Sequence, residues 1–251
     1  MGDKLNNTTG IQWYESNDLE SEDLVKDKNN EAIDLITSIE RFHIKKGDKM
    51  LDVGCGNGLI GAEFKRSKNI YVSGMDLSPK SVEIAKKYGI NAVVADIDQE
   101  WPYPASSFDI LLGVEIVEHI FNTDNFFSES RRVLKKNGLL IITTPNLAAW
   151  FNRILLLVGY QPFFTEVSTK DKTMGLGFTR KLTPNRETVG HLRVFTLKAL
   201  EDMLHSFGFD ICMKKGKHVG YFPSYISIAD KVFTKFPSLA ADMLIVAKNV
   251  K

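Results

Sequence analysis

Two carboxylates and an imidazole lie close together in the segment VEIVEHI. Glu115, Glu118 and His119 have the spacing i, i+3 and i+4, so their side chains share one face if the segment forms a helical turn. A second histidine, His191, follows much later in the segment GHLRVFT. Carboxylates and imidazoles remove protons from reacting hydroxyl groups or hold the metal ions that help to do so. These residues are therefore the first candidates for catalysis.

A glycine-rich segment, LDVGCGNG, follows an apolar run. Glycine is costly to order, so several glycines between a strand and a helix indicate a loop whose backbone N–H groups approach a ligand. Gly56, Gly58 and Gly61 fit the dinucleotide pattern Gly-x-Gly-x-x-Gly, with Asp76 at a suitable distance to hold a ribose. In a second pattern, Asp52 precedes glycines at alternate positions.

The elements that position these residues alternate between strands and helices. Nearly continuous apolar runs predict buried parallel strands, and amphipathic runs between them predict helices on both faces of the sheet. The strands are predicted at residues 50–53, 70–76, 90–96, 108–115, 139–146, 209–215 and 242–248. The helices are predicted at residues 31–42, 59–67, 79–89, 126–138, 196–208 and 225–236, the one at 126–138 ending in a glycine cap.

The pattern that begins at Asp52 accounts for more of the chain, because it explains a carboxylate inside the first strand. With it, the sequence resembles the class I S-adenosylmethionine-dependent methyltransferases, whose first motif looks like LDVGCGNG. The segments GMDLS, VVADIDQEWPYPASSFDILLGVEIVEHI and VLKKNGLLIITTPN resemble later motifs of the family in the same order. The resemblance implies an α/β, Rossmann-like fold with a seven-stranded mixed sheet, order 3-2-1-4-5-7-6, strand 7 antiparallel and helices on both faces.

The same resemblance implies that the chain binds S-adenosylmethionine and releases S-adenosylhomocysteine. Asp76 would accept both ribose hydroxyls, and Asp96 with the backbone of Ile97 would contact the adenine. Each aspartate also has a simpler explanation as a helix cap or a turn residue, and Cys55 is explained as a small filler of the loop. The implied donor-binding residues are Asp52, Gly54, Cys55, Gly56, Gly58, Asp76, Leu77, Asp96, Ile97 and Glu115.

A metal site is also implied by two branches of the family, the ubiquinone-pathway O-methyltransferases and the small-RNA 2′-O-methyltransferases. Both carry a similar Glu-x-x-Glu-His segment and a later histidine, which there hold a divalent metal. Carried over, the ligands of a Mg²⁺, Mn²⁺ or Zn²⁺ ion would be Glu115, Glu118, His119 and His191. The alternative is a metal-free site in which His119 is a base of ordinary pKa near 6.5.

Substrate specificity is expected in the variable parts: an N-terminal arm at residues 1–30, and a lid-like insert at residues 147–190 within the methyltransferase domain at 31–251. Aromatic residues there either line an acceptor site or pack the lid onto the domain. They are Trp13, Tyr14, Trp150, Phe151, Tyr160, Phe163 and Phe164. The insert also carries a basic cluster of Lys170, Lys172, Arg180, Lys181 and Arg186.

The composition is that of an ordinary globular protein. Thirty-two basic residues against 31 acidic ones leave no bulk field to attract nucleic acid. Two cysteines and no long apolar run favour the cytoplasm. The expected function is methyl transfer to an oxygen of a small molecule. The alternatives are a non-catalytic S-adenosylmethionine-binding sensor or regulatory subunit and, more distantly, an NAD-dependent dehydrogenase.

Overall fold

The computed structural model describes residues 21–183, 185–218 and 224–250. Trp13 and Tyr14, two of the candidate substrate residues, lie outside these ranges. In the part of the chain that the structure describes, no helix is both long and apolar enough to cross a membrane.

One seven-stranded sheet organises the molecule, in the order β3-β2-β1-β4-β5-β7-β6. β7 runs antiparallel to both of its neighbours, and the other pairs are parallel. The predicted sheet order and the antiparallel last strand are thereby confirmed. The strands are β1 (Lys49–Val53), β2 (Tyr71–Asp76), β3 (Asn91–Val94), β4 (Phe108–Val114), β5 (Leu134–Pro145), β6 (Phe209–Lys217) and β7 (Asp242–Asn249).

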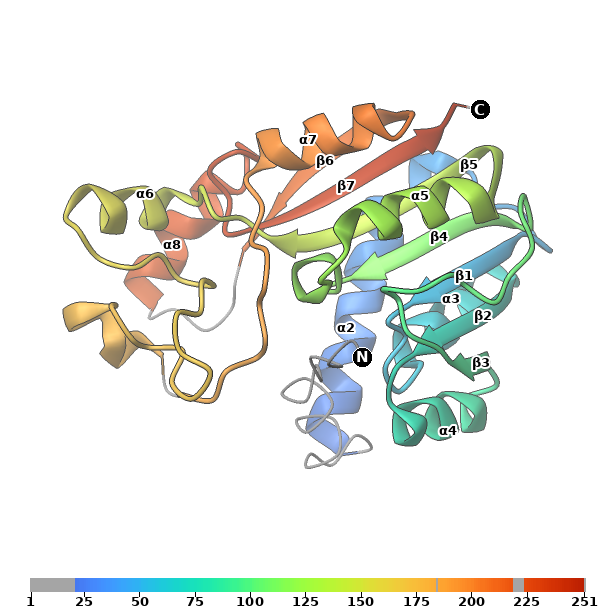
Figure 1. The fold of residues 1–251 in the computed structure, drawn as a ribbon, viewed down its shortest axis with the longest axis horizontal. Helices are drawn as coiled ribbons and strands as arrows, with labels where there is room; N and C mark the ends of the chain where they lie inside the picture. Colours follow the sequence, from blue (N-terminus) through green and yellow to red (C-terminus); the bar gives the residue numbers. More distant parts are fainter. Residues whose placement is uncertain (1–20, 184, 219–223, 251) are drawn as a thin grey trace, which may run out of the picture.

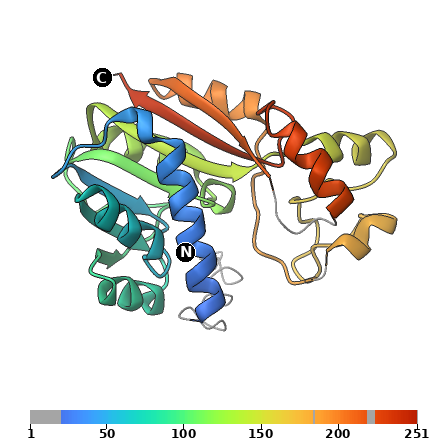
Figure 2. The ribbon, with the colours of Figure 1, turned by 180° about the vertical axis from the view of Figure 1, so that it is seen from behind.

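Helices cover both faces of the sheet (Figures 1 and 2). On one face, α2 (Glu22–Ser38), α3 (Leu59–Lys68) and α4 (Pro79–Lys87) bury side chains such as Leu35 and Phe64 against the strands. On the other face, α5 (Thr123–Val133) and α7 (Leu197–Ser206) bury Phe126, Phe127 and Leu200. The sheet is therefore apolar on both sides, as its continuous apolar strands predict.

The helix predicted to run to residue 138 is shorter than expected. α5 ends at Val133, and Leu134 already pairs with Phe108 of β4. Gly138 caps no helix: a Cβ at this position would lie 3.0 Å from the backbone oxygen of Lys135 and 3.1 Å from that of Asp109. Glycine is needed here because two backbone segments approach closely, and strand pairing overrides the local helical pattern.

α2 begins at Glu22, earlier than the predicted residue 31, and crosses the expected boundary at residue 30 as one continuous helix. Ser21 occupies its N-cap position, with Glu22 and Asp23 in the first turn, where acidic side chains interact favourably with the helix dipole.

The insert forms a separate small lobe beside the carboxyl ends of the parallel strands (Figure 1). It contains α6 (Trp150–Leu157) and a 3₁₀ segment (Gly177–Leu182), and α8 (Ser224–Phe233) packs with it. Phe151, Phe163 and Leu176 make the buried core of this lobe together with Ala241 from the chain leading into β7. The insert is thus anchored to the sheet through its own apolar core.

Candidate functional site

The glycine loop connects β1 to α3, and its backbone conformation explains its residues. Gly54, Gly56 and Gly58 have φ angles of 71°, 51° and 77°, in the left-handed region that favours glycine. A Cβ on Gly54 would lie 2.6 Å from the Ile116 side chain, and one on Gly58 would lie 2.8 Å from Ala85. The loop is therefore packed tightly against the protein itself, including the turn that follows β4.

Two buried aspartates lie at this loop. Asp76, at the end of β2, accepts hydrogen bonds from the N–H of Gly56 at 2.9 Å and of Ser78 at 2.9 Å. Asp52, in β1, has its Oδ2 buried without a hydrogen-bond partner. Burial, followed by the nearby Asp76, raises the pKa of Asp52 to about 7. An uncompensated carboxylate of this kind fits a cationic ligand group, such as the ammonium of the donor's amino-acid tail.

The loop after β3 carries the two residues expected to contact an adenine. Asp96 is exposed, and its Oδ1 accepts the N–H of Asp98 at 3.0 Å. The carbonyl of Ile97 accepts hydrogen bonds from Trp101 Nε1 and Asn125 Nδ2, both at 3.0 Å. Asp96 therefore makes a hydrogen bond that is typical of a turn residue. Its contact with the adenine stays a prediction.

Cys55 lies inside the glycine loop as a buried free thiol. A Cβ on Gly74 would come within 2.8 Å of its sulfur, so the thiol fills the space beside β2. Burial, followed by the nearby Asp52 and Asp76, raises the pKa of Cys55. Its surroundings match the prediction of a small filler.

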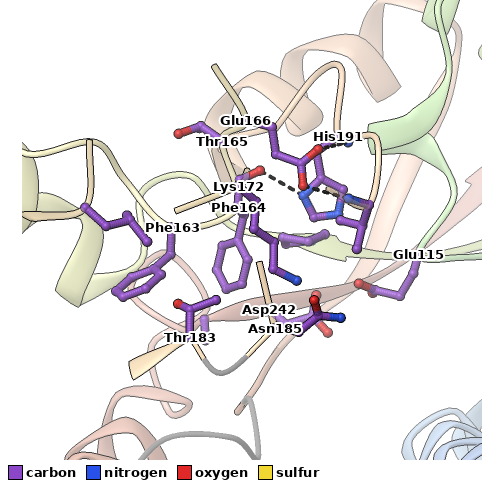
Figure 3. Close-up of a pocket in the computed structure, with 14 residues that line it drawn as sticks. Glu115, Phe163, Phe164, Thr165, Glu166, Lys172, Thr183, Asn185, His191 and Asp242 are labelled. Carbon is purple, nitrogen blue, oxygen red and sulfur yellow. Dashed lines mark hydrogen bonds between the residues drawn. The ribbon is translucent and has the colours of Figure 1, made fainter. Parts of the chain in front are cut away.

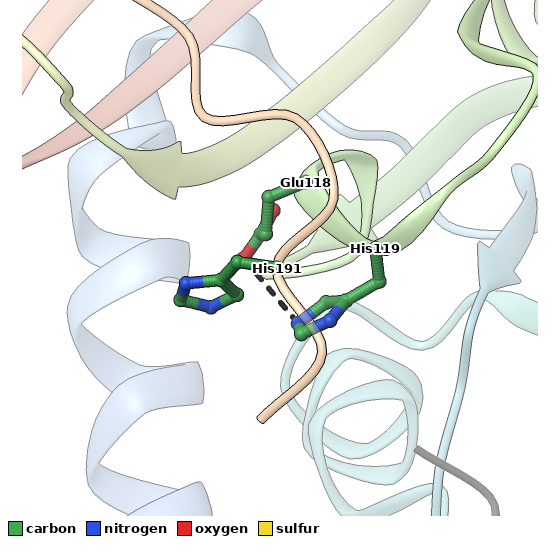
Figure 4. A group of neighbouring side chains, drawn as sticks. All are labelled: Glu118, His119 and His191. Atoms are coloured by element: carbon green, nitrogen blue, oxygen red, sulfur yellow. Dashed lines mark ion pairs between the residues drawn. The ribbon is translucent and has the colours of Figure 1, made fainter. Parts of the chain in front are cut away.

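The turn after β4 differs from the predicted helical face. Glu115 has φ = 48°, a left-handed conformation, and only Val117–His119 form a helical turn, of the 3₁₀ type. The prediction that Glu115, Glu118 and His119 share one helical face is therefore wrong, because the backbone at Glu115 is left-handed. Glu118 and His119 lie near His191, whereas Glu115 is not a member of this group (Figure 4).

Glu118, His119 and His191 form a compact group, with one potential ligand atom from each lying within 4.8 Å of the others. The two imidazole rings have centroids 4.9 Å apart, and His119 Nε2 lies 3.7 Å from Glu118 Oε1. This group exists because the insert returns to the sheet: the N–H groups of Leu192 and Arg193 donate to the Glu118 carbonyl at 2.8 and 3.0 Å. The predicted closure of residues 147–190 over the strand ends is present.

The two imidazoles are held as neutral rings of defined orientation. Burial lowers the pKa of His119 from its ordinary value near 6.5 to about 4, and burial also lowers the pKa of His191. His119 Nδ1 lies 3.1 Å from the Gly190 carbonyl, and His191 Nδ1 lies 2.8 Å from the Phe164 carbonyl. Because a carbonyl only accepts, we assign the ring proton to Nδ1 in both, which leaves each Nε2 with a lone pair.

Glu118 is buried, and only one of its two carboxylate oxygens is hydrogen bonded. Oε2 accepts the hydroxyl of Thr144 at 2.9 Å, whereas Oε1 has no hydrogen-bond partner. Burial, followed by the nearby Glu115, raises the pKa of Glu118. Glu118 Oε1 and His119 Nε2 lie 3.7 Å apart, and His191 adds a third potential ligand atom within 4.8 Å.

Glu166 fixes the segment that carries His191, and sequence reasoning missed it. Its two carboxylate oxygens accept the N–H groups of Val189 and Gly190, both at 2.8 Å, and of His191 at 3.3 Å. A lone glutamate in an irregular insert gives no signal of this role in the sequence.

A cavity of about 390 Å³ adjoins the histidine group, within the range of small-molecule sites (Figure 3). Phe163 and Phe164 line it and also pack in the core of the lobe, whereas Trp150 stacks on Phe233 with ring centroids 5.1 Å apart. Of the basic cluster, Lys172 lines the cavity, and Arg180 pairs with Asp171 at 2.9 Å.

Comparisons with known proteins find methyltransferases both by sequence and by fold. Residues 51–142 match the methyltransferase domain family. A ubiquinone biosynthesis O-methyltransferase of Pelagibacter ubique is 38% identical over 120 residues, which cover 43% of this chain and 49% of that protein. A 27-O-demethylrifamycin SV methyltransferase of Amycolatopsis mediterranei is 31% identical over 109 residues, 39% of each chain. The chain thus spans about half the length, or less, of these curated relatives.

Solved structures share the fold at low sequence identity. A protein from Pyrococcus horikoshii superposes with a TM-score of 0.60 at 18% identity, covering 95% of this chain and 98% of that one. A SAM-dependent methyltransferase from Thermotoga maritima gives 0.55 at 18% identity, covering 88% and 91%. The antiparallel β7 further separates this sheet from the dinucleotide-binding order 3-2-1-4-5-6.

Proposed function

We propose that this chain, whose residues 51–142 match a methyltransferase domain family, is a class I S-adenosylmethionine-dependent methyltransferase that transfers a methyl group to an oxygen of a small-molecule acceptor. One observation carries the proposal. The insert brings His191 beside Glu118 and His119, next to a cavity and to a turn whose Ile116 packs on the glycine loop. A donor loop, a group able to activate a hydroxyl and an acceptor cavity are thus contiguous.

The chain's contribution to the donor is binding and orientation. The donor's sulfonium supplies an already activated methyl group. Asp52 supplies a carboxylate with a buried, unpartnered oxygen for the donor's amino-acid tail. Asp76, which contacts the same glycine loop at Gly56, would bind the ribose of the donor. Asp76 also holds the N–H groups of Gly56 and Ser78, so the same carboxylate orders the loop and binds the ligand. Alignment of donor and acceptor is the main source of rate in such a displacement.

The acceptor hydroxyl must lose its proton, and the neutral imidazoles offer lone pairs that would receive this proton or hold a metal ion that activates the hydroxyl. His119 and His191 present Nε2 lone pairs, because each Nδ1 faces a backbone carbonyl. Glu118, which neighbours the two imidazoles, is fully buried. An amine or a carboxylate acceptor would not need this arrangement, and the site therefore favours a hydroxyl oxygen.

Glu118, His119 and His191 also fit a divalent metal. Two neutral imidazoles with Nδ1 held by carbonyls and one orphaned carboxylate oxygen are the ligand set and supporting hydrogen bonds that such sites use. The ligand atoms, which lie within 4.8 Å of one another, would move closer, to roughly 3.0–3.4 Å apart, for ligand distances near 2.1 Å. Two imidazoles favour Zn²⁺ or Mn²⁺ over Mg²⁺, which prefers oxygen ligands. When bound, such an ion lowers the pKa of an acceptor hydroxyl.

The reducing cytoplasm is the compartment that we propose. Cys55 and Cys212 are both free thiols, and the rest of the site needs no oxidising environment.

Calorimetry and an activity screen test the function together. S-adenosylhomocysteine is expected to bind and NAD(H) is not, and the reverse would overturn the donor assignment in favour of the dehydrogenase alternative. A panel of phenols and catechols incubated with S-adenosylmethionine is expected to yield O-methylated products by mass spectrometry. Donor binding without turnover of hydroxyl, amine or carboxylate acceptors would instead support the sensor alternative.

A further inference from the structure

The cavity beside His191 has an apolar wall and an acidic floor (Figure 3). Phe163, Phe164 and Leu176 supply the wall from the insert. Glu115, which follows β4, and Asp242, which begins the antiparallel β7, supply the floor. Both carboxylates reach the same edge of the sheet because an antiparallel strand starts where its parallel neighbours end.

The floor has too little positive charge for its two carboxylates. Glu115 Oε1 is buried and has no hydrogen-bond partner. Asp242 Oδ1 accepts the N–H of Met243 at 2.7 Å, and Lys217 Nζ lies 4.0 Å from Asp242 Oδ2, the limit of an ion pair. Among the described residues no other ion pair reaches either carboxylate. Burial raises the pKa of both groups; the Thr143 hydroxyl and Lys217 at Glu115, and Lys217 at Asp242, offset this in part, so one lysine serves two carboxylates.

We infer that the acceptor of the proposed methyl transfer carries a protonated amine, remote from its reacting oxygen, which Glu115 and Asp242 bind while Phe163 and Phe164 hold its apolar body. This inference rests on the proposed function, because only a methyltransferase has an acceptor. It adds the chemical class of that acceptor. An ammonium group offers three hydrogen-bond donors and the charge that the floor lacks.

We place the amine at the Asp242 end of the cavity, away from the atom that receives the methyl group. β7, which begins at Asp242, lies three strand spacings, or roughly 14 Å, from β1, which leads into the donor loop, whereas β4, which precedes Glu115, is the neighbour of β1. His191 lines the same cavity and belongs to the group that activates oxygen. An elongated molecule with an oxygen at one end and an amine at the other matches this layout.

Lys172 also lines the cavity and favours the opposite kind of ligand, one with a carboxylate. Lys172 is a single half-exposed cation on the insert, whereas the floor presents two carboxylates: Asp242 is buried, and Glu115 is half-buried with its Oε1 atom buried. The floor therefore outweighs Lys172 in our inference, and the experiment below separates the two.

Three matched probes test the inference on the full chain saturated with S-adenosylhomocysteine. Phenethylamine, 2-phenylethanol and phenylacetate share one apolar body and differ in the remote group, and none has a phenolic oxygen to methylate. Calorimetry or ligand-observed NMR at pH 7.5 is expected to show the amine bound about tenfold tighter than the alcohol, with the carboxylate weakest. Glu115→Gln and Asp242→Asn are each expected to reduce the amine's advantage to about threefold or less.

Glu83→Gln is the matched control, since Glu83 is an exposed glutamate on α4. It should retain the preference for the amine. S-adenosylhomocysteine affinity of each variant is measured in parallel, so a folding or donor defect is recognised separately. Tighter binding of phenylacetate, equal binding of the three probes, no binding of the amine, or an unchanged preference in both floor variants would overturn the inference. Absence of methyl transfer with intact amine binding would remove the proposed function alone.

Discussion

The N–H of Leu192 donates a 2.8 Å hydrogen bond to the backbone carbonyl of Glu118. This contact joins the end of the insert to the turn after β4, and Arg193 adds a second N–H at 3.0 Å. His191 directly precedes Leu192 in the chain. The contact therefore places His191, at the end of the insert, beside Glu118 and His119 in the turn after β4.

Removing the carboxylate of Glu166 should misplace His191. Glu166→Gln replaces one oxygen with an amide donor that faces backbone N–H groups, so the segment 189–191 loses part of its anchor. We expect kcat to fall about 10–100-fold, the usual effect of residues that orient an active-site ligand. Glu187→Gln, an exposed glutamate of the same insert, should leave kcat unchanged. Equal effects of both variants would contradict the anchoring role.

Asp76→Ala should weaken donor binding by one to two decades. The substitution removes a charge-assisted acceptor, a loss of about 1.5–3 kcal/mol, and it also frees the N–H groups of Gly56 and Ser78. Asp96→Ala should have a smaller effect, because Asp96 is exposed and the backbone of Ile97 remains. Titration calorimetry with S-adenosylhomocysteine checks both. An Asp76→Ala protein with wild-type affinity would show that the loop has been assigned to the wrong ligand.

The donor-free protein should become less stable as pH rises from about 4 to 7. Asp52 has its pKa raised from 3.8 to about 7, mainly by burial, so in this window the folded state binds more protons than the unfolded state. The free energy of unfolding therefore falls with pH, by up to about 4 kcal/mol from this group. Asp52→Asn should flatten the dependence in urea unfolding measured at pH 5 and 8. A wild-type protein whose stability rises over this window, with Asp52→Asn unchanged, would refute the assignment.

Metal removal separates the two mechanisms that the histidine group allows. If Glu118, His119 and His191 hold an ion, chelator treatment should abolish turnover, Zn²⁺ or Mn²⁺ should restore it, and His191→Ala should reproduce the loss. If His119 acts alone as a base, turnover should survive the chelator and be lost in His119→Ala. Acceptor-dependent formation of S-adenosylhomocysteine is the measurement, and bound metal is quantified by elemental analysis of the same samples.

Trp150, an expected substrate residue, should prove to be structural. Its ring stacks on Phe233, and its Nε1 donates to Asp230 Oδ1 at 3.1 Å, so it holds α6 against α8. Trp150→Leu should destabilise the protein by about 2 kcal/mol, seen as a lower thermal midpoint, with the acceptor KM unchanged. A raised KM at unaltered stability would return Trp150 to the acceptor site.

Local signals in the sequence were sufficient for most of the fold. Apolar runs and turn residues fixed the strands, and Ser78 before Pro79 marked the start of α4, where its hydroxyl accepts the N–H of Ser81. The predicted helix at residues 126–138 was too long, because pairing with a distant strand overrides the local helical preference. Leu134 pairs with Phe108 of β4, and Gly138 lies where two backbone segments approach closely instead of capping α5.

The sequence by itself determined the sheet order, through its resemblance to the methyltransferases, and the candidates Glu118, His119 and His191. Only the tertiary structure decided that these three meet while Glu115 turns toward Asp242 and the cavity. The physical reason is that a residue's side-chain direction depends on its own φ, which reverses at Glu115, and on hydrogen bonds made by residues far away in the chain, such as Glu166. Spacing along a segment contains neither piece of information.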